Sequence, residues 1–177
     1  NFDQIPLAKH LGHVECNQLA GLKLTHHFFS KWKKEKRRGL LSFTVSSVAF
    51  FPSPYSVIYG ATKSFLKNFI ESFAVEAAHH GVDVLEFSPQ YTRTRLYDKT
   101  MKLGILDLFA YFGSEPADVA RCMLQSVGKV THREQGAYSI FMKIVGGLMF
   151  DLNILTPIMS FALKLAPEYK QLQEKKD

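Results

Sequence analysis

Residues 39–89 read GLLSFTVSSVAFFPSPYSVIYGATKSFLKNFIESFAVEAAHHGVDVLEFSP. This stretch has two short apolar runs rich in strand-forming residues, 40–45 and 82–87, on either side of a segment whose apolar residues repeat at helical spacing. Gly81 follows the helical segment and Pro89 follows the second run, which is typical of the ends of a helix and a strand. The order strand, helix, strand predicts an α/β unit with parallel strands.

The rest of the chain extends this alternation. Before this stretch we expect a mostly helical segment over 7–38 that ends at Gly39. After it we expect a loop through about residue 113 and then a helix that runs toward Gly128, with Ser114 as its N-cap and Pro116 in its first turn. A third strand over 136–141 and further helices complete the predicted order. We therefore predict a single domain over residues 1–177, in which 1–140 form the sheet with its helices and 141–177 form a helical C-terminal region.

The composition is that of a globular protein. Of the 177 residues, 46% are hydrophobic and 21% are charged, which argues against wholesale disorder. The two cysteines, Cys16 and Cys122, provide no disulfide framework and no metal-ligand spacing. We expect both to be small buried hydrophobic residues in a protein that faces a reducing compartment, and we expect no metal site.

The positive charge is concentrated in one segment. The net charge is +6, and residues 31–38 contain six of the basic residues together with Glu35. A run of this kind before a glycine most often forms a solvated helix C-terminus. The alternative is contact with an anionic membrane surface, with Trp32 as an interfacial anchor. Trp32 is the only aromatic residue in the run and no nucleic-acid motif accompanies it, so we expect no nucleic-acid partner.

The chain shows no secretory or membrane-spanning signal. It opens with Asn1, Phe2 and Asp3 instead of a methionine and a basic-then-apolar leader, so we expect a fragment or a processed chain. The most apolar stretch, 141–163, is interrupted by charged, polar and proline residues. We expect amphipathic helices there that lie over the core or at a membrane surface.

Tyr59 and Lys63 are spaced one helical turn apart, so they lie on the same helix face. An ammonium beside a phenol favours the phenolate, which makes such a pair suitable as a proton donor for carbonyl reduction. The pair continues the apolar stripe of Leu66, Phe69, Ile70 and Phe73. The alternative is that Lys63 extends from the first turn into solvent while Tyr59 packs.

Polar residues follow both predicted strands of this unit. Ser46 follows the first strand, and residues 89–94 follow the second. Ligands of parallel α/β sheets bind beyond the carboxyl ends of the strands, so we expect these residues at a binding site.

These residues together resemble the short-chain dehydrogenase/reductase superfamily. The resemblance rests on Ser46, on Tyr59-Gly60-Ala61-Thr62-Lys63, on Ser88-Pro89, and on Thr92-Arg93-Thr94. The run from Phe51-Pro52-Ser53-Pro54 to Lys63 is similar to the 17β-hydroxysteroid dehydrogenase and very-long-chain 3-oxoacyl-CoA reductase branch. The likeness spans about residues 10–170, and it implies a Rossmann-like doubly wound parallel sheet that lacks its first βαβ unit.

The resemblance implies a role for several residues. Tyr59 would exchange a proton with the substrate oxygen, and Lys63 would assist it and bind the nicotinamide ribose. A serine would hold the substrate oxygen; the family spacing of thirteen selects Ser46, whereas the double serine could also select Ser47. Asn17 resembles the asparagine that anchors a proton-relay water; its alternative is an ordinary polar helix residue.

The resemblance also implies a cofactor, NADP or NAD, and a lipid-like substrate such as a steroid or fatty-acyl compound. Pro89, Thr92 and Thr94 match the segment that contacts nicotinamide and phosphate. Branch members suggest the endoplasmic reticulum membrane or the cytoplasm, association with a membrane surface, and a homodimer. The family's glycine-rich turn, G-x-x-x-G-x-G, does not occur in this sequence. The competing hypothesis is therefore a truncated, non-catalytic member that acts as a binding or structural module through an exposed sheet edge.

Overall fold

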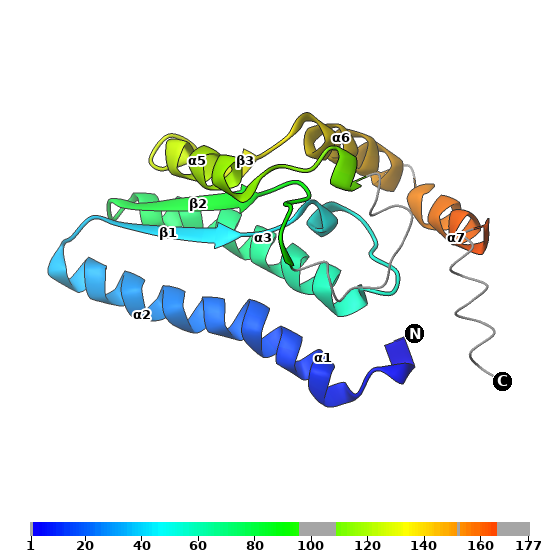
Figure 1. Ribbon diagram of the computed structural model, residues 1–177. Coiled ribbons are helices and arrows are strands. Elements are labelled where there is room, and N and C mark those ends of the chain that lie inside the picture. The colour runs from blue at the N-terminus through cyan, green and yellow to red at the C-terminus, as the bar shows by residue number, and fades with distance from the viewer. Residues whose placement is uncertain (1, 96–108, 152, 166–177) are drawn as a thin grey trace.

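A computed structural model describes residues 2–95, 109–151 and 153–165 of the chain, and its centre is a three-stranded sheet in the order β1-β2-β3 (Figure 1). The N-terminal helical arm consists of η1 (Phe2–Gln4), α1 (Leu7–Val14), the π-helical segment η2 (Glu15–Leu19) and α2 (Ala20–Glu35). It is followed by β1 (Gly39–Thr44), η3 (Ser47–Phe50), α3 (Val57–Ala78) and β2 (Val82–Ser88). The remaining described elements are α5 (Pro116–Ser126), β3 (His132–Glu134), α6 (Ala137–Asp151) and α7 (Leu155–Leu165).

The three strands run parallel. β1 pairs with β2 from Gly39 opposite Val82 to Thr44 opposite Phe87, and β3 pairs with the carboxyl half of β2. All carboxyl ends therefore point to the same edge of the sheet. Helices cover both faces, with α2 and α3 on one side and α5 on the other (Figure 1), so the predicted parallel α/β fold is confirmed.

The core lies between α3 and the sheet. Leu66 and Ile70 of α3 are buried against Leu41 and Val84 of the strands. Complete burial of an aliphatic side chain of this size contributes about 1.5–3 kcal/mol. Phe69 and Phe73 pack on the same cluster, and the apolar stripe expected from the sequence is thus confirmed.

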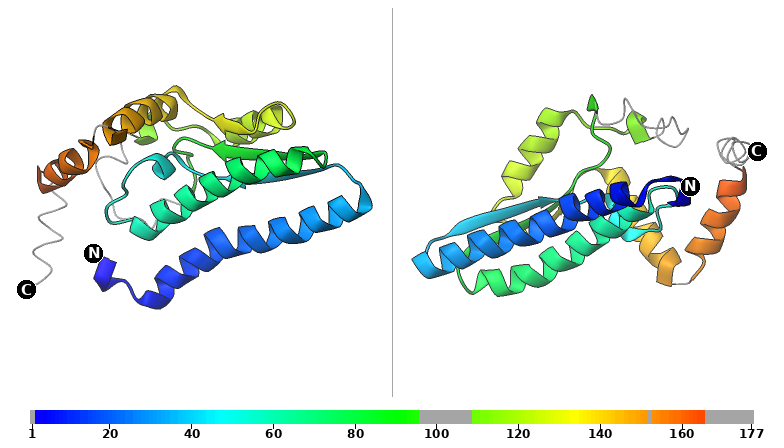
Figure 2. Two further views of the ribbon diagram at one scale, coloured as in Figure 1. Left: turned by 180° about the vertical axis from the view of Figure 1, so that it is seen from behind. Right: turned by 90° about the horizontal axis from the view of Figure 1, so that it is seen from below.

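The helical arm packs beside α3 on the same face of the sheet (Figure 2). The Phe29 ring meets the Phe73 ring edge to face, with 4.9 Å between their centroids. Gly21 lies so close to α3 that an added Cβ would be 3.5 Å from Leu66. A helix of this length is held in place by such tertiary contacts more than by its intrinsic propensity.

The predicted end of this arm at Gly39 is wrong. The helix ends at Glu35, and Lys36 takes the left-handed conformation, with φ 52°. Gly39 is the first residue of β1, and its backbone lies against the Trp32 ring, which leaves no room for a Cβ. Gly39 therefore permits close packing of the indole, and Trp32 packs against the core cluster while staying half-buried.

The third strand was predicted four residues too late. It runs from His132 to Glu134, whereas residues 137–151 form α6. Gly136, with φ 94°, turns the chain between them. A short apolar run does not distinguish a strand from a buried helix by its periodicity, and here the helix forms.

Two smaller expectations are also corrected. Glu115, and not Ser114, is the N-cap residue of α5, while Pro116 occupies the first turn as predicted. Cys16 is exposed and Cys122 is half-buried, and both are free thiols; the expectation of two buried cysteines is therefore wrong. The predicted loop up to residue 113 falls partly on residues 96–108, outside the described part.

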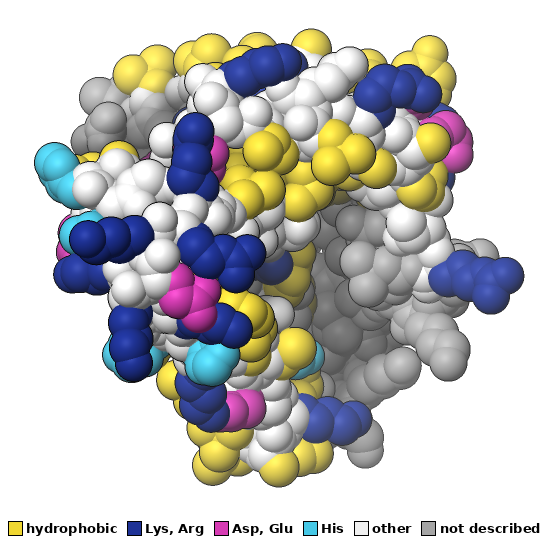
Figure 3. Space-filling view, turned by 90° about the vertical axis from the view of Figure 1, so that its left-hand side faces the viewer, with side chains coloured by type: hydrophobic (Ala, Val, Ile, Leu, Met, Phe, Trp, Pro, Cys, Tyr) yellow, Lys and Arg dark blue, Asp and Glu magenta, His cyan; other side chains and the backbone are white. Residues whose placement is uncertain are grey.

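The basic segment forms the exposed end of the helical arm. Lys33 and Lys34 occupy the last turn of α2, where their positive charges interact favourably with the negative end of the helix dipole. Figure 3 shows Lys and Arg side chains gathered on this end of the molecule, which agrees with a solvated helix end. None of the helices in the described ranges has the length and apolar character needed to cross a bilayer.

Candidate active site

Asn17 is fixed against the first turn of α3 by a hydrogen bond between side chains. Its Nδ2 donates to Thr62 Oγ1 over 3.1 Å, and Thr62 Oγ1 donates to the Tyr59 carbonyl over 2.8 Å. Thr62 is only 1% exposed, so this hydroxyl has lost its water partners. Asn17 lies in the π-helical segment η2, and such π-bulges occur frequently at functional sites.

Lys63 turns toward the carboxyl end of β1. Its Nζ donates to the Thr44 carbonyl over 2.8 Å and lies 5.7 Å from the centroid of the Tyr59 ring. Burial lowers the pKa of Lys63, and the nearby Cys16 side chain acts weakly in the opposite direction. Tyr59 and Lys63 are thus neighbours, as predicted, and the ammonium bonds to the backbone instead of extending into solvent.

Ser46 and Ser47 follow β1 directly. Ser46 caps η3, because its Oγ accepts a hydrogen bond from the Val48 N–H over 3.4 Å. Ser47 is the first residue of η3, and both serines are half-buried. Both stay candidates for the residue that holds the substrate oxygen.

The segment after β2 is held in place by its own polar contacts. Thr92 Oγ1 donates to the Gln90 carbonyl over 3.1 Å, and Thr92 forms a parallel bridge with Ser114. Pro89 is half-buried, whereas Thr94 is exposed. These residues lie beyond the carboxyl end of β2, where the sequence placed them, and their roles toward a cofactor stay predictions.

The donors around Lys63 suit the ribose of a nicotinamide cofactor. An ammonium has three N–H donors, and the Thr44 carbonyl takes one of them. Asn17 and Lys63 line the same groove between α2 and β1, with a volume of about 590 Å³. The residues present therefore fit the hydroxyl-bearing part of the cofactor, whereas the sequence contributes no glycine-rich turn for its phosphates.

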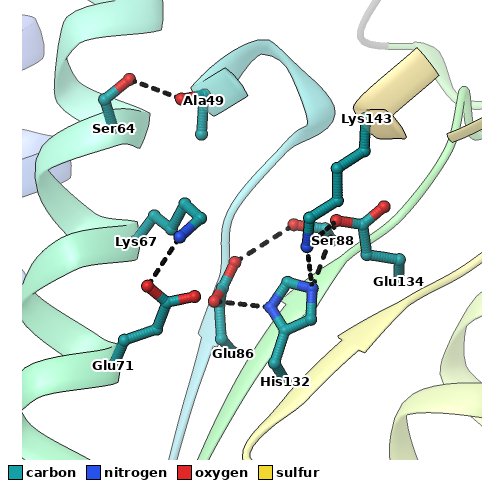
Figure 4. Close-up of polar contacts among 9 residues, drawn as sticks. All are labelled: Ala49, Ser64, Lys67, Glu71, Glu86, Ser88, His132, Glu134 and Lys143. Atoms are coloured by element: carbon teal, nitrogen blue, oxygen red, sulfur yellow. Dashed lines mark hydrogen bonds and ion pairs between the residues drawn. The ribbon is translucent and has the colours of Figure 1, made fainter. Parts of the chain in front are cut away.

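A second polar cluster lies under α3 at the β3 edge of the sheet, and sequence reasoning missed it (Figure 4). Glu86 of β2 is 0% exposed, and its Oε2 lies 2.7 Å from His132 Nδ1. The other ring nitrogen of His132 lies 3.2 Å from Glu134 Oε1, and Lys143 Nζ of α6 lies 2.9 Å from that oxygen. Glu86 within the apolar run 82–87 was the available signal, because a buried strand seldom carries an unpaired charge.

The carboxylates of this cluster shift its protonation equilibria. Hydrogen bonds to Glu134 and Glu86 raise the pKa of His132 to about 9. Burial acts to raise the pKa of Glu134, but the bonds from His132 and Lys143 outweigh it and lower that pKa. His132 is therefore protonated at neutral pH and balances the buried carboxylates.

The same cluster contains a group with metal-binding atoms. One ligand atom each from Glu71, Glu86 and His132 lies within 4.8 Å of the others. Lys67 Nζ is 2.6 Å from Glu71 Oε2, and Lys143 approaches from the other side. Because ammonium and imidazolium groups already balance the carboxylates, we interpret the cluster as an internal ion network that joins α3, the sheet and α6.

Comparison with known proteins gives consistent matches. The family model described as short chain dehydrogenase matches residues 2–102. An uncharacterized short-chain type dehydrogenase/reductase of Sinorhizobium fredii is 34% identical over 84 residues, which cover 48% of this chain and 34% of that protein. The very-long-chain 3-oxoacyl-CoA reductase of Podospora anserina is 34% identical over 71 residues, which cover 40% of this chain and 21% of that protein.

Solved structures share the fold at lower identity. A 7beta-hydroxysteroid dehydrogenase aligns with a TM-score of 0.68 and 22% identity, over 80% of this chain and 54% of that chain. A short-chain dehydrogenase from Streptomyces avermitilis aligns with a TM-score of 0.65 and 18% identity, over 99% of this chain and 65% of that chain. A 4-hydroxyisoleucine dehydrogenase mutant complexed with NADH and succinate aligns with a TM-score of 0.60 and 19% identity, over 70% of this chain and 56% of that chain. The matched region thus spans about a third or less of the curated relatives and about half to two thirds of these solved chains.

Proposed function

The chain belongs to the short chain dehydrogenase family, and from this premise we propose that it provides the acid-base site of an NAD(P)-dependent oxidoreductase that interconverts a carbonyl and an alcohol. The observation that carries the proposal is the arrangement around the first turn of α3. Asn17 is bonded to Thr62, and the partly desolvated Lys63 lies next to the Tyr59 ring. A lysine with a perturbed pKa at the carboxyl end of a parallel sheet supports a catalytic role.

In this proposal Tyr59 passes a proton to the substrate oxygen. The Lys63 ammonium favours the phenolate that remains, and its free N–H donors bind the ribose hydroxyls of the cofactor. Ser46 or Ser47 holds the substrate oxygen, and Asn17 anchors a water that relays the proton. Pro89, Thr92 and Thr94 border the nicotinamide and phosphate. The cofactor, NADP or NAD, supplies the hydride chemistry.

The substrate is proposed to be a steroid or fatty-acyl lipid. Support comes from the very-long-chain 3-oxoacyl-CoA reductase relative and from the apolar surface of the C-terminal helices. That surface also supports association with a membrane at the endoplasmic reticulum; a second copy of the chain and a cytoplasmic location are the other candidates. The competing function, a non-catalytic binding module, is favoured by the edge of β1 with which no described residue pairs.

Replacement of Tyr59 by phenylalanine tests the proposed chemistry. Tyr59→Phe should lower NAD(P)H-dependent reduction of a steroid ketone or a 3-oxoacyl thioester by at least about 100-fold, the usual contribution of a positioned proton donor. Tyr111→Phe is the matched control, since Tyr111 is 79% exposed on the surface. Circular dichroism should show an unchanged fold for both variants. Turnover retained by Tyr59→Phe would refute the assignment, and a wild-type protein without turnover would favour the binding module.

A further inference from the structure

The short segment η3 carries the two candidate serines at its start. Ser46 caps it, Ser47 begins it, and the Ala49 N–H donates to the Ser46 carbonyl over 2.9 Å. A 3-10 helix of 4 residues makes few hydrogen bonds of its own, and their geometry is poorer than in an α-helix. The position of the serines therefore depends on how the rest of η3 is held by other elements.

The end of η3 is contacted by α3 and by α6. The Ala49 carbonyl accepts a hydrogen bond from Ser64 Oγ of α3 over 2.9 Å (Figure 4). Gly146 of α6 lies so close to the Phe51 ring that an added Cβ would be 2.6 Å from it. Ser64 is exposed, so water can replace its bond. The contacts of the aromatic residues are therefore the ones that decide where η3 lies.

Two ammonium groups lie over the ring of Phe50, the last residue of η3. Lys143 Nζ of α6 is 4.4 Å from the ring centroid, and Lys67 Nζ of α3 is 5.2 Å from it. At such distances the negative face of an aromatic ring attracts a cation. The side chains of Lys143 and Lys67 are only 35% and 22% exposed, and partial loss of water strengthens this attraction.

Each of these ammonium groups is fixed by a carboxylate of the ion network. Lys143 Nζ lies 2.9 Å from Glu134 Oε1, and Lys67 Nζ lies 2.6 Å from Glu71 Oε2 (Figure 4). The Glu134 side chain is 6% exposed. The ion pairs already restrict both lysine side chains, so their contact with the ring costs little further side-chain entropy. The network thus presents two fixed cations to Phe50.

We propose that Phe50 is a positioning residue: its ring, held by the ammonium groups of Lys67 and Lys143, fixes η3 and thereby the serine at the start of η3. Through Lys143, the helix α6 then helps to set the geometry at Ser46 or Ser47. The fixing of η3 stands by itself, whereas its effect on the substrate oxygen rests on the proposed function.

Phe50→Leu tests the proposal, because it keeps an apolar side chain and removes the aromatic face. The Ala49 amide reports on η3, since its hydrogen bond lies within that segment. We expect hydrogen exchange at this amide to be at least about fivefold faster than in the wild type, with unchanged exchange at the Ile70 amide in the centre of α3. Phe50→Tyr keeps the ring and should restore slow exchange. Phe141→Leu is the matched control, because Phe141 lies on α6 but is 60% exposed.

A second pair of variants shows whether the ammonium acts through the ring. Lys143→Met should also speed exchange at the Ala49 amide, whereas Lys143→Arg keeps a cation and should not. The double variant of Phe50→Leu and Lys143→Met should exchange about as fast as Phe50→Leu alone, since both changes remove the same contact. Multiplied effects would overturn the proposal, because Lys143 would then act without the ring. Equal exchange at Ala49 in Phe50→Leu and Phe141→Leu would overturn it as well.

Kinetics separate this proposal from the proposed function. Phe50→Leu should lower kcat for carbonyl reduction by about tenfold, the order of loss for a displaced positioning group, and Phe50→Tyr should restore it. The KM for the nicotinamide cofactor should not change, because the serine holds the substrate oxygen and not the cofactor. Unchanged kcat beside faster exchange at Ala49 would overturn the positioning role. If the wild type shows no turnover, the proposed function fails, while the difference in exchange still supports the fixing of η3 by Phe50.

Discussion

The Thr62 hydroxyl joins two parts of the chain that are 45 residues apart. It accepts from Asn17 Nδ2 and donates to the Tyr59 carbonyl in a site that is 1% exposed. Thr62→Val keeps the shape of the side chain but leaves the Asn17 amide without this partner. Because Asn17 is half-buried and water can reach its amide, we expect a loss of about 1 kcal/mol in the free energy of unfolding, the usual net contribution of a hydrogen bond, measured by urea denaturation.

Ser64→Ala is the matched control for Thr62→Val. Ser64 lies on the same helix, and its hydroxyl also bonds to backbone carbonyls, those of Ala49 and Gly60. The Ser64 side chain is exposed, so water can replace the lost bonds and the expected change is below about 0.5 kcal/mol. Equal losses for the two variants would mean that the Asn17–Thr62 bond contributes no more to the free energy of unfolding than an exposed hydrogen bond does.

At the scale of the elements, the cluster around His132 ties β2, β3 and α6 together. The pKa of His132 is raised to about 9 from its ordinary value of 6.5. The contribution of protonated His132 to the free energy of unfolding is therefore complete below pH 6.5 and is lost as the pH rises through 9. The shift corresponds to about 3 kcal/mol, and because the His132 side chain is 26% exposed we expect a loss of about 2 kcal/mol.

Urea unfolding at pH 6, 7, 8, 9 and 10 measures this loss. Glu86→Gln removes one of the two carboxylates that raise the pKa of His132. The free energy of unfolding of this variant should therefore fall less between pH 7 and pH 10. His80→Gln is the control, since His80 is exposed at the end of α3, and it should retain the full slope. The same contacts lower the pKa of Glu134, which adds a separate loss of stability only at acidic pH. A slope that persists in Glu86→Gln would show that another group titrates.

The sequence predicted the strands and helices wherever local pattern and tertiary packing agree. The runs at 40–45 and 82–87 and the helix between them satisfy both, and they formed as expected. The apolar run after Gly136 was ambiguous, because its length suits a strand and its spacing suits a helix, and only packing decides. Gly39 was predicted to end a helix because glycine is common after helix C-termini. In the structure it begins β1 and lets the Trp32 ring pack against the backbone.

The candidate site was predictable to the same degree. Tyr59 and Lys63 are local neighbours, so their spacing was enough to place them together. The bond between Asn17 and Thr62 and the capture of Lys63 by the Thr44 carbonyl depend on how the arm packs on α3. Glu86 pairs with His132 of β3, 46 residues away, and no sequence pattern joins residues that distant.

At the scale of the whole molecule, the basic end of α2 is separated from the apolar C-terminal helices. The basic end of α2 lies at one end of the molecule and α7 at the other (Figure 1). Large apolar side chains of the C-terminal helices remain exposed: Ile144 is 66%, Leu148 62%, Phe161 65% and Leu165 67% exposed. An apolar stripe of this kind on successive helices suits the interfacial region of a bilayer. Because the basic segment is far from it, attraction to anionic lipid should contribute little.

We therefore predict that the chain binds vesicles of neutral phosphatidylcholine and that 0.5 M salt changes this binding less than twofold. The double substitution Leu148→Lys and Phe161→Lys removes an apolar group from each helix and should weaken binding at least tenfold, since each buried side chain of this size contributes about 1.5–3 kcal/mol. Leu124→Lys is the control, because Leu124 is 73% exposed but lies on α5. Vesicle co-sedimentation measures the binding. If sedimentation velocity instead shows a lipid-free dimer that the double substitution dissociates, a second copy covers these helices, because the same apolar stripe can be buried only once.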